Sequence, residues 1–427
     1  MRELQIRIEK NGDMVPVGRI IGNDPADARF QYYSAYRDDN GAVPISISLP
    51  LQEDPFSPMQ TAAFFEGLLP EGFTRRSVAQ WMNLDEGDYL SLLHGLGREC
   101  LGAICILEEG EHTEAAYEPV SAETIRDLAA EGVVKSSEIV TKAHLSLTGA
   151  SGKVGLYYDS DQDRWYLPKG SAPSTHIVKQ SHVRLSSIVT NEQLSLMTAA
   201  RCGIAIPRSF IINTGSGQEN EVLFATERYD RTISSQAEEI SGLRRPLRLH
   251  QEDFSQAMGI PSARKYERGE DHYMKGMFDL LRLYSADPIA DQLKLWDMII
   301  FSFLIGNTDA HIKNFSLLYD ADLRTILLAP AYDIISTVVY EQSTREMAFR
   351  IGGAKSIDEI DEEAFRRAAG EAGLGERMAL SRFRTMCERF EPALARSAEE
   401  LSEAGYLKAI ELKESILETA GIRKHKK

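Results

Sequence analysis

The chain has 427 residues, of which 43% are hydrophobic and 26% are charged, as is usual for a soluble globular protein of two or three domains. Its formal net charge of −16 argues against a chain-wide nucleic-acid-binding surface, because such binding needs basic side chains that neutralise phosphates. The four cysteines lack CxxC spacing, so we expect reduced thiols in a cytoplasmic protein without disulfides or a zinc site. The start lacks an apolar signal core and no apolar run is long enough to cross a membrane, so we expect no membrane anchor.

The first part of the chain is predicted to form a separate β-rich subdomain, residues 1–112. Residues 4–8 and 45–49 alternate apolar and polar side chains, and NGD and DDNG provide turns between strands. Residues 60–94 have helical patterning, and the strand-like LGAICILEE closes the unit. Residues 108–122 are acidic and lack apolar periodicity, so we interpret them as a linker.

The next unit contains SLTGASGKVGLYY, in which apolar segments flank a glycine-containing turn. Backbone N–H groups of such a turn are suited to contacting phosphates, and a lysine at its end adds positive charge. The spacing is not that of a Walker A motif, and an ordinary hairpin turn is the simpler interpretation of this stretch alone. The residues of the turn are Thr148, Gly149, Ala150, Ser151, Gly152 and Lys153.

A strand and a helix follow this turn. Residues 175–180, THIVKQ, predict a short strand that carries Lys179. The following helix is expected to begin near Thr190 or Asn191, with Glu192 in its first turn. A strand lysine before a helix glutamate is the order of the ion pair that positions nucleotide phosphates in protein kinases. In isolation, however, Lys179 is better explained as a solvated strand lysine, and Glu192 as an acid that interacts favourably with the helix dipole.

Two further strands, IAIPRSFIIN and EVLFATERYD, complete a predicted small lobe, residues 122–232. The composition becomes helical from Asp230 onward, which predicts a larger helical lobe, residues 233–427. Glu227, Arg228 and Tyr229 fall where the two lobes should meet, and there they could bond the edge of an adenine ring.

The stretch FSFLIGNTDAHIKNFSLLY carries the strongest indication of chemistry. A buried helix is predicted to end at Gly306, and a polar loop follows it at once. Asp309 and Asn314 have the spacing of the kinase catalytic-loop residues that orient the hydroxyl and hold magnesium. Two strand-like segments then lead to Tyr332 and Asp333, where kinases place a metal-binding Asp. Asp309 and Asn314 alone fit a helix cap and a turn, but Asp333 and the upstream lysine favour phosphoryl transfer.

Eight motifs in this order resemble the HipA family of bacterial serine/threonine-protein kinase toxins: FFEGLLPEG, SLTGASGK, HIVKQ, NEQL, ERYDR, LHQEDFSQAMG, GNTDAHIKNFSL and PAYDI. The resemblance covers nearly the whole chain. It implies an α+β, two-lobed fold related to protein kinases and phosphoinositide 3-kinases, with an added N-terminal β-rich subdomain. It also implies ATP and magnesium as cofactors, an aminoacyl-tRNA synthetase as substrate in the best-known members, and a HipB-like helix-turn-helix antitoxin through which the kinase reaches DNA in a type II toxin–antitoxin system.

The family's functional positions can be carried onto this chain. The resemblance assigns the catalytic role to Asp309, magnesium ligation to Asn314 and Asp333, and phosphate contact to Lys179. The hinge falls on residues 227–229. Further nucleotide-contacting positions are His311, Ile312, Lys313, Asn314 and Tyr332.

The resemblance also places the nucleotide-binding loop on residues 148–153, and the serine that is autophosphorylated on Ser146. The family usually has Gln after the Gly-Ala of this loop, whereas this chain has Ser151 and Gly152. That departure leaves open which serine is modified.

Two other functions stay open. The chain could be a non-catalytic scaffold that bridges antitoxin dimers on operator DNA, or a kinase with a small-molecule or lipid acceptor. Magnesium-dependent stabilisation by ATP would be absent from the scaffold. The small-molecule kinase would transfer label from ATP to something other than protein.

Overall fold

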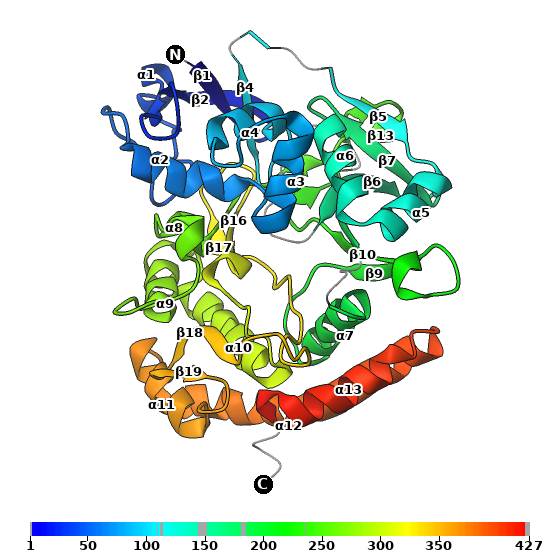
Figure 1. Cartoon of the computed structure of the whole chain (residues 1–427). Coiled ribbons are helices and arrows are strands. Elements are labelled where there is room, and N and C mark those ends of the chain that lie inside the picture. The colour runs from blue at the N-terminus through cyan, green and yellow to red at the C-terminus, as the bar shows by residue number, and fades with distance from the viewer. Residues whose placement is uncertain are drawn as a thin grey trace.

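The structure, a computed structural model, describes residues 2–108, 110–111, 114–143, 152–180, 185–234 and 236–422. Three parts follow one another along the chain: an N-terminal β-rich subdomain, a small lobe on a six-stranded sheet and a larger helical lobe (Figure 1). This is the α+β architecture that the sequence predicts.

The N-terminal subdomain is built on an antiparallel sheet of strand order β3-β2-β1-β4. The predicted alternation in residues 4–8 is confirmed, because Leu4, Ile6 and Ile8 are buried in the core. The elements are β1 (Arg2–Lys10), β2 (Asp13–Gly22), β3 (Arg29–Tyr32), α1 (Ser34–Arg37), α2 (Pro58–Phe65), the 3₁₀ turn η1 (Glu66–Leu68), α3 (Gly72–Met82), α4 (Tyr89–Leu96) and β4 (Ile104–Glu108).

Residues 45–49 form a loop with one isolated bridge, so the strand expected from their alternation is wrong. The Ser46 hydroxyl and the Ile47 N–H donate hydrogen bonds of 2.5 and 3.0 Å to the Glu252 carboxylate of the helical lobe. Because Glu252 satisfies these polar groups, they need no neighbouring strand. The loop thereby connects the N-terminal subdomain to the helical lobe.

The small lobe is built on a sheet of order β5-β7-β6-β8-β10-β9, in which every neighbouring pair is antiparallel. The edge strand β5 lies inside residues 108–122, so the interpretation of this whole stretch as a linker is wrong. Tyr117 of β5 packs on Tyr157 of the same sheet, with ring centroids 4.7 Å apart. The elements are β5 (Ala116–Pro119), α5 (Ala122–Glu131), α6 (Val133–Ala143), β6 (Lys153–Asp159), β7 (Arg164–Lys169), β8 (His176–Gln180), α7 (Ile188–Arg201), β9 (Ser209–Asn213), the 3₁₀ turn η2 (Glu219–Glu221) and β10 (Val222–Glu227).

Helix α7 begins at Ile188, earlier than the predicted Thr190 or Asn191, so Glu192 lies in its second turn and not in the first. The N–H of Ser187, just before the helix, donates a 2.7 Å hydrogen bond to the Glu219 carboxylate. A distant side chain therefore satisfies this end of the helix, and the local sequence gives no indication of it.

The helical lobe contains the predicted buried helix α10, which ends at Gly306 with φ +78°. Helix α12 packs against α10 of its own lobe and against α7 of the small lobe, and it crosses beneath both lobes in Figure 1. The elements are β11 (Arg231–Thr232), β12 (Glu239–Ile240), β13 (Leu243–Arg244), β14 (Leu247–Arg248), β15 (Gln251–Asp253), α8 (Phe254–Ala257), η3 (Ser262–Arg264), α9 (Tyr273–Tyr284), α10 (Pro288–Ile305), η4 (Ile312–Asn314), β16 (Ser316–Tyr319), β17 (Ile326–Leu328), β18 (Glu346–Ile351), β19 (Ala354–Ser356), α11 (Glu362–Glu371), α12 (Glu376–Glu403) and α13 (Lys408–Thr419).

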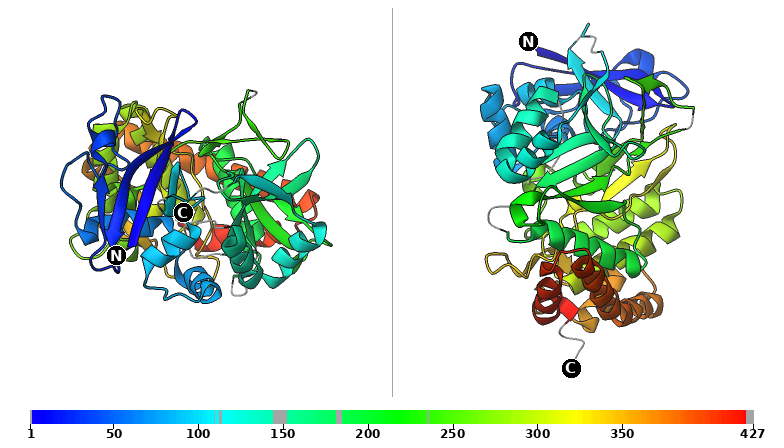
Figure 2. Two further views of the ribbon diagram at one scale, coloured as in Figure 1. Left: turned by 90° about the horizontal axis from the view of Figure 1, so that it is seen from above. Right: turned by 90° about the vertical axis from the view of Figure 1, so that its right-hand side faces the viewer.

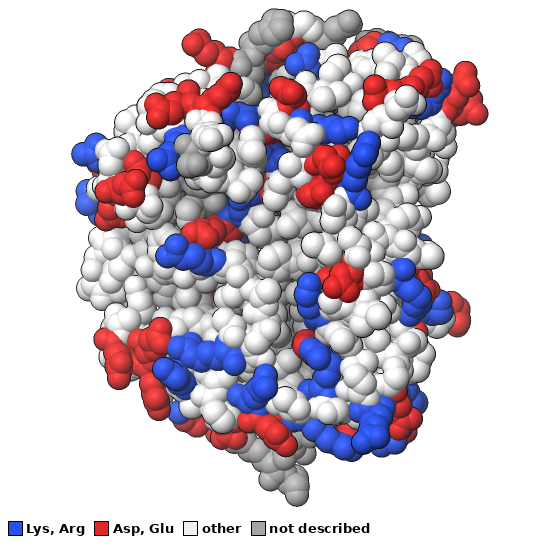
Figure 3. Space-filling view, turned by 180° about the vertical axis from the view of Figure 1, so that it is seen from behind, with Lys and Arg blue, Asp and Glu red and all other residues white. Residues whose placement is uncertain are grey.

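One hydrophobic core extends through all three parts, and β1 and α13 lie at opposite ends of the molecule (Figure 2). Acidic and basic side chains are interspersed over the face in Figure 3. Of the helices in the described ranges, none is both long and apolar enough to cross a membrane.

Candidate active site

A cavity of about 290 Å³ lies where the small lobe, the helical lobe and the N-terminal subdomain meet. Strand β8 contributes Lys179 and α7 contributes Glu192 from the small lobe. The loop after α10 contributes Asp309 and Asn314, and the segment after β17 contributes Asp333. The structure therefore brings together the acids, the amide and the lysine that the sequence predicts to act together.

The loop after α10 holds Asp309 by its backbone. Gly306 reverses the chain in a left-handed conformation, and the Asp309 N–H then donates to the Asn307 side chain at 3.2 Å. The Asn314 amide donates to the Asp309 carbonyl at 3.0 Å, so the Asn314 side-chain oxygen is left for another partner. These bonds explain why Asp309 and Asn314 need their spacing of five residues.

The predicted ion pair between Lys179 and Glu192 is confirmed, with an N–O distance of 2.6 Å. The Lys179 ammonium also lies 2.6 Å from Asp333. Burial lowers the pKa of Lys179, but attraction by Asp333 and Glu192 outweighs this and raises it overall. Burial would likewise raise the pKa of Asp333, yet Lys179 and Lys153 hold it well below its usual range. Both groups are therefore charged at neutral pH.

Asn314 and Asp333 offer the oxygen ligands that Mg²⁺ prefers. The described residues contain no group of three or more His, Cys, Asp or Glu side chains arranged to hold a metal ion. Magnesium in phosphoryl-transfer sites is usually held by one or two protein ligands together with substrate phosphates and water. Asp333 has φ +55°, a conformation that is strained for a non-glycine residue and frequent at functional sites.

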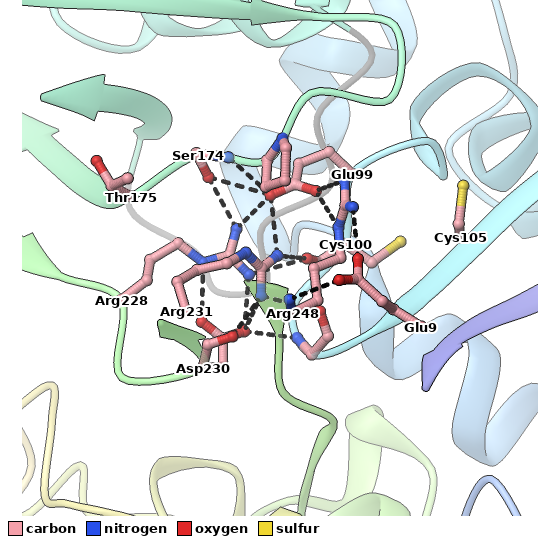
Figure 4. Close-up of polar contacts among 12 residues, drawn as sticks. Glu9, Glu99, Cys100, Cys105, Ser174, Thr175, Arg228, Asp230, Arg231 and Arg248 are labelled. Atoms are coloured by element: carbon pink, nitrogen blue, oxygen red, sulfur yellow. Dashed lines mark hydrogen bonds and ion pairs between the residues drawn. The ribbon is translucent and has the colours of Figure 1, made fainter. Parts of the chain in front are cut away.

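The predicted hinge residues differ in their orientation. Glu227 and Tyr229 line the cavity, and the Tyr229 ring stacks on Tyr332 with centroids 5.5 Å apart. The Tyr332 hydroxyl donates a 2.9 Å hydrogen bond to the Lys313 carbonyl. Arg228 also lines the cavity, but its guanidinium group turns away into a buried ionic cluster (Figure 4).

All the N–H donors of Arg228 have protein partners in this cluster. Glu99, from the N-terminal subdomain, lies 2.9 Å from both Arg228 and Arg231 and 2.7 Å from Arg248. Figure 4 shows Glu99 among these arginines. Only backbone atoms of Arg228 remain for contact with a ligand.

The other predicted loop positions also differ. His311 is buried and lines the cavity, burial lowers its pKa to about 3, and its Nδ1 atom has no hydrogen-bond partner among the described residues. Lys313 lines the cavity as well, but its ammonium group lies 2.9 Å from Asp253. Ile312 is fully buried in the core, so its side chain is not available to a nucleotide and only its backbone could make such a contact.

Ser146 and residues 148–151 lie outside the described residues. Of the glycine-containing turn, Gly152 is buried, and a Cβ atom at this position would lie 1.8 Å from the Gln180 side chain. Lys153 lines the cavity. Burial lowers its pKa to about 8, although attraction by Asp333 acts in the opposite direction. The end of the turn therefore contributes a positive charge to the cavity.

Glu71 and Lys265 line the cavity and were not predicted as site residues. Tyr266, next to Lys265 in the chain, was not predicted either. Glu71 lies 2.6 Å from Lys265, and the Tyr266 hydroxyl donates a 2.6 Å hydrogen bond to Asp309. Glu71 stands between Pro70 and Gly72, and an acid between two helix-breaking residues was the one available signal. The sequence around Lys265 and Tyr266 carries no comparable indication.

Comparisons with known proteins agree with this architecture. The family model of the HipA N-terminal domain matches residues 11–107, and that of the HipA-like C-terminal domain matches residues 145–394. Y4mE of Sinorhizobium fredii, whose name assigns it provisionally to the kinases, is 34% identical over 404 residues, covering 90% of this chain and 91% of that protein.

The serine/threonine-protein kinase toxin HipA of Shewanella oneidensis is 27% identical over 379 residues, covering 85% of this chain and 82% of that protein. A structure of HipA from the same organism, in complex with HipB and its operator DNA, matches with a TM-score of 0.79 at 23% identity, covering 99% of this chain and 97% of that one. The chain therefore belongs to the HipA family.

Proposed function

We propose that this chain is a serine/threonine protein kinase that uses ATP and Mg²⁺. In this proposal, Asp309 orients the acceptor hydroxyl, Asn314 and Asp333 hold the metal ion, and Lys179 contacts the phosphates. The observation that carries the proposal is the convergence of these residues with the Lys179–Glu192 ion pair around one cavity. The similarity to a HipA that is named as a serine/threonine-protein kinase toxin supports it.

In the transfer, the acceptor hydroxyl oxygen bonds to the γ-phosphorus as the bond to the ADP oxygen breaks, and the hydroxyl proton passes to Asp309 or to solvent. Bound Mg²⁺ neutralises charge on the phosphate oxygens. Glu192 keeps the Lys179 ammonium at the cavity wall, and burial in this cavity strengthens its attraction for an anion. Among the described residues, no hydrogen-bond partner is found for the Nδ1 atom of His311, and such an atom fits a polar ligand.

The test uses labelled ATP, Mg²⁺ and purified wild type, Asp309→Asn, and Asp54→Asn as a control in an exposed loop. We expect label in protein for the wild type and the control, and at least a hundredfold loss for Asp309→Asn. Wild-type-like labelling by Asp309→Asn would refute the role of Asp309. Label that appears in a small molecule instead would point to a different acceptor class. A chain that ATP and Mg²⁺ do not stabilise thermally would be the non-catalytic scaffold.

We also propose a HipB-like helix-turn-helix antitoxin as partner, and DNA binding mainly through that partner. The match to a HipA chain from a complex with HipB and operator DNA supports this proposal, as does the net charge of −16, which disfavours direct DNA binding. In gel-shift assays, this chain should retard operator DNA only when the antitoxin is present. Retardation by the chain alone would contradict the proposal.

The acceptor that we propose is a protein, with an aminoacyl-tRNA synthetase as the first candidate, and Ser146 is the proposed autophosphorylation site. About two added negative charges beside a phosphate-binding loop would repel ATP and switch activity off. Mass spectrometry after incubation with ATP should find phosphate on Ser146. Phosphoproteomics of cells that express wild type or Asp309→Asn should find the external acceptor.

A further inference from the structure

We propose that Tyr266 is a positioning residue for the Asp309 carboxylate, and that Glu71 of the N-terminal subdomain holds the Tyr266 segment in place through Lys265. This inference rests on the proposed function and extends it. It makes the N-terminal subdomain part of the catalytic apparatus, because Glu71 and the loop that carries Tyr266 meet at the cavity.

The hydrogen bonds of Asp309 leave one atom for chemistry. Its N–H is bound by Asn307, and its carbonyl accepts from Asn314 and from the His311 N–H. Carboxylate atom Oδ1 accepts the hydroxyl of Tyr266 at 2.6 Å. Atom Oδ2 has no hydrogen-bond partner among the described residues. With the backbone and one carboxylate oxygen fixed, Oδ2 is the atom that can receive a substrate hydroxyl.

This hydrogen bond limits rotation of the carboxylate. The terminal torsion of an Asp side chain has a broad, roughly two-fold preference and is poorly fixed by itself. Asp309 lines the cavity and is exposed, so close packing does not hold its side chain. A hydrogen bond to a charged group contributes enough to favour one orientation. Loss of the Tyr266 hydroxyl should therefore misorient the carboxylate and leave the rest of the site intact.

The segment around Tyr266 is anchored on both sides. On one side, the Lys265 ammonium lies 2.6 Å from Glu71 and 5.5 Å from the centre of the Tyr266 ring. On the other, the Glu267 N–H donates to the Ala348 carbonyl at 2.8 Å, and the buried Glu267 carboxylate accepts the Tyr273 N–H at 3.0 Å. Tyr266 itself is 39% exposed. An exposed side chain held so firmly is suited to positioning a neighbour.

Glu71 reaches this segment from the N-terminal subdomain. It precedes α3, and Gly72 beside it has φ +53°, a backbone conformation that favours glycine. Its second carboxylate oxygen lies 3.5 Å from the ammonium of Lys313 in the catalytic loop. Burial raises the pKa of Glu71, but Lys313 and Lys265 together lower it overall, so the carboxylate is charged when it binds both lysines.

The first experiment compares Tyr266→Phe with wild type and with Tyr284→Phe, a control on a half-exposed tyrosine at the end of α9. We expect Tyr266→Phe to lower kcat by about tenfold to a hundredfold. The KM for ATP and the thermal stabilisation by MgATP should stay unchanged, which a general structural defect would not allow. An unchanged or raised kcat would overturn the inference, and so would a rise in the KM for ATP that accounts for the whole loss.

The second experiment tests the contribution of Glu71. Glu71→Gln should lower kcat, as Tyr266→Phe does. Glu66→Gln should leave kcat unchanged, because Glu66 forms its ion pair with Arg75 inside the N-terminal subdomain, at 2.7 Å. If Glu71 acts through Tyr266, the double variant with Tyr266→Phe should lose less activity than the product of the two single losses. Fully multiplicative losses would overturn the connection between them.

Inactive wild-type protein would refute the proposed function and this inference with it. If the wild type is active and Tyr266→Phe has the same kcat, this inference alone would be refuted.

Discussion

The substitution Glu99→Gln tests the buried cluster where the N-terminal subdomain meets the hinge. Gln has nearly the shape of Glu but no charge, and Glu99 binds Arg228 and Arg231 at 2.9 Å and Arg248 at 2.7 Å. Removing one partner of a buried ion pair costs about 3–5 kcal/mol, because a desolvated charge is left uncompensated. In the variant, Arg228 and Arg231 still form ion pairs with Asp230, and Arg248 still forms one with Glu9. We therefore expect a loss near the lower limit, about 3 kcal/mol.

Urea unfolding at pH 7 would measure this loss as a shift in midpoint at constant slope. Glu118→Gln is a matched control, since the Glu118 side chain is 63% exposed and its ion pair with Lys169 contributes about 0–1 kcal/mol. Equal stabilities for the two variants would refute the reasoning.

The pH dependence provides an internal check on Glu99. Burial would raise the pKa of Glu99, but Arg231, Arg248 and Arg228 hold it well below the usual 4.5. A lowered folded-state pKa means that the charge contributes stability above pH 4.5 and loses it as the pH falls below that value. The difference between wild type and Glu99→Gln should therefore stay constant from pH 5 to 8 and shrink in acid.

Three other substitutions give separate tests. Burial raises the pKa of Glu252 from 4.5 to about 7, so the protonated carboxyl contributes stability that is lost as the pH rises through this interval. Measured by urea unfolding, the free energy of unfolding of Glu252→Gln should therefore rise relative to wild type by up to about 3 kcal/mol between pH 4.5 and 7.5. A difference that stays constant with pH would refute this. Gly306→Ala should lower the free energy of unfolding by at least about 2 kcal/mol, because φ is +78° and the new Cβ would lie 2.3 Å from Val338; a wild-type melting curve would contradict it. Lys179→Met should abolish stabilisation by MgATP in a thermal-shift assay, and a retained shift would exclude Lys179 from nucleotide binding.

The loop after α10 could be predicted because its geometry is local. A buried helix, a glycine at its end and two polar residues five positions apart are all readable within the stretch from α10 to Asn314, and the structure forms them through bonds inside that stretch. The Lys179–Glu192 pair was also accessible, because a strand and the next helix present both residues to one cavity.

Other features depend on contacts between distant segments. The start of α7 is satisfied by Glu219, and the alternating residues 45–49 are held in a loop by Glu252. The side chain of Arg228 binds Glu99, which is far away in the sequence. Periodicity describes how an element buries one face, and it carries no information about which charge from another part of the chain will satisfy a polar group.

The N-terminal subdomain contacts the cleft between the lobes at both of its ends. At one end, Glu99 binds Arg228 and Arg248. At the other, near the loop after α10, Glu71 binds Lys265 and approaches Lys313. Rotating one lobe away from the subdomain would separate at least one of these partners and leave a buried charge unpaired, at a cost of several kcal/mol. On the far side of the cleft, α12 packs on α7 and on α10 together. Charge on one side and hydrophobic packing on the other therefore favour one fixed orientation of the lobes. The subdomain that supplies the charges also supplies the Glu71 carboxylate beside the loop after α10.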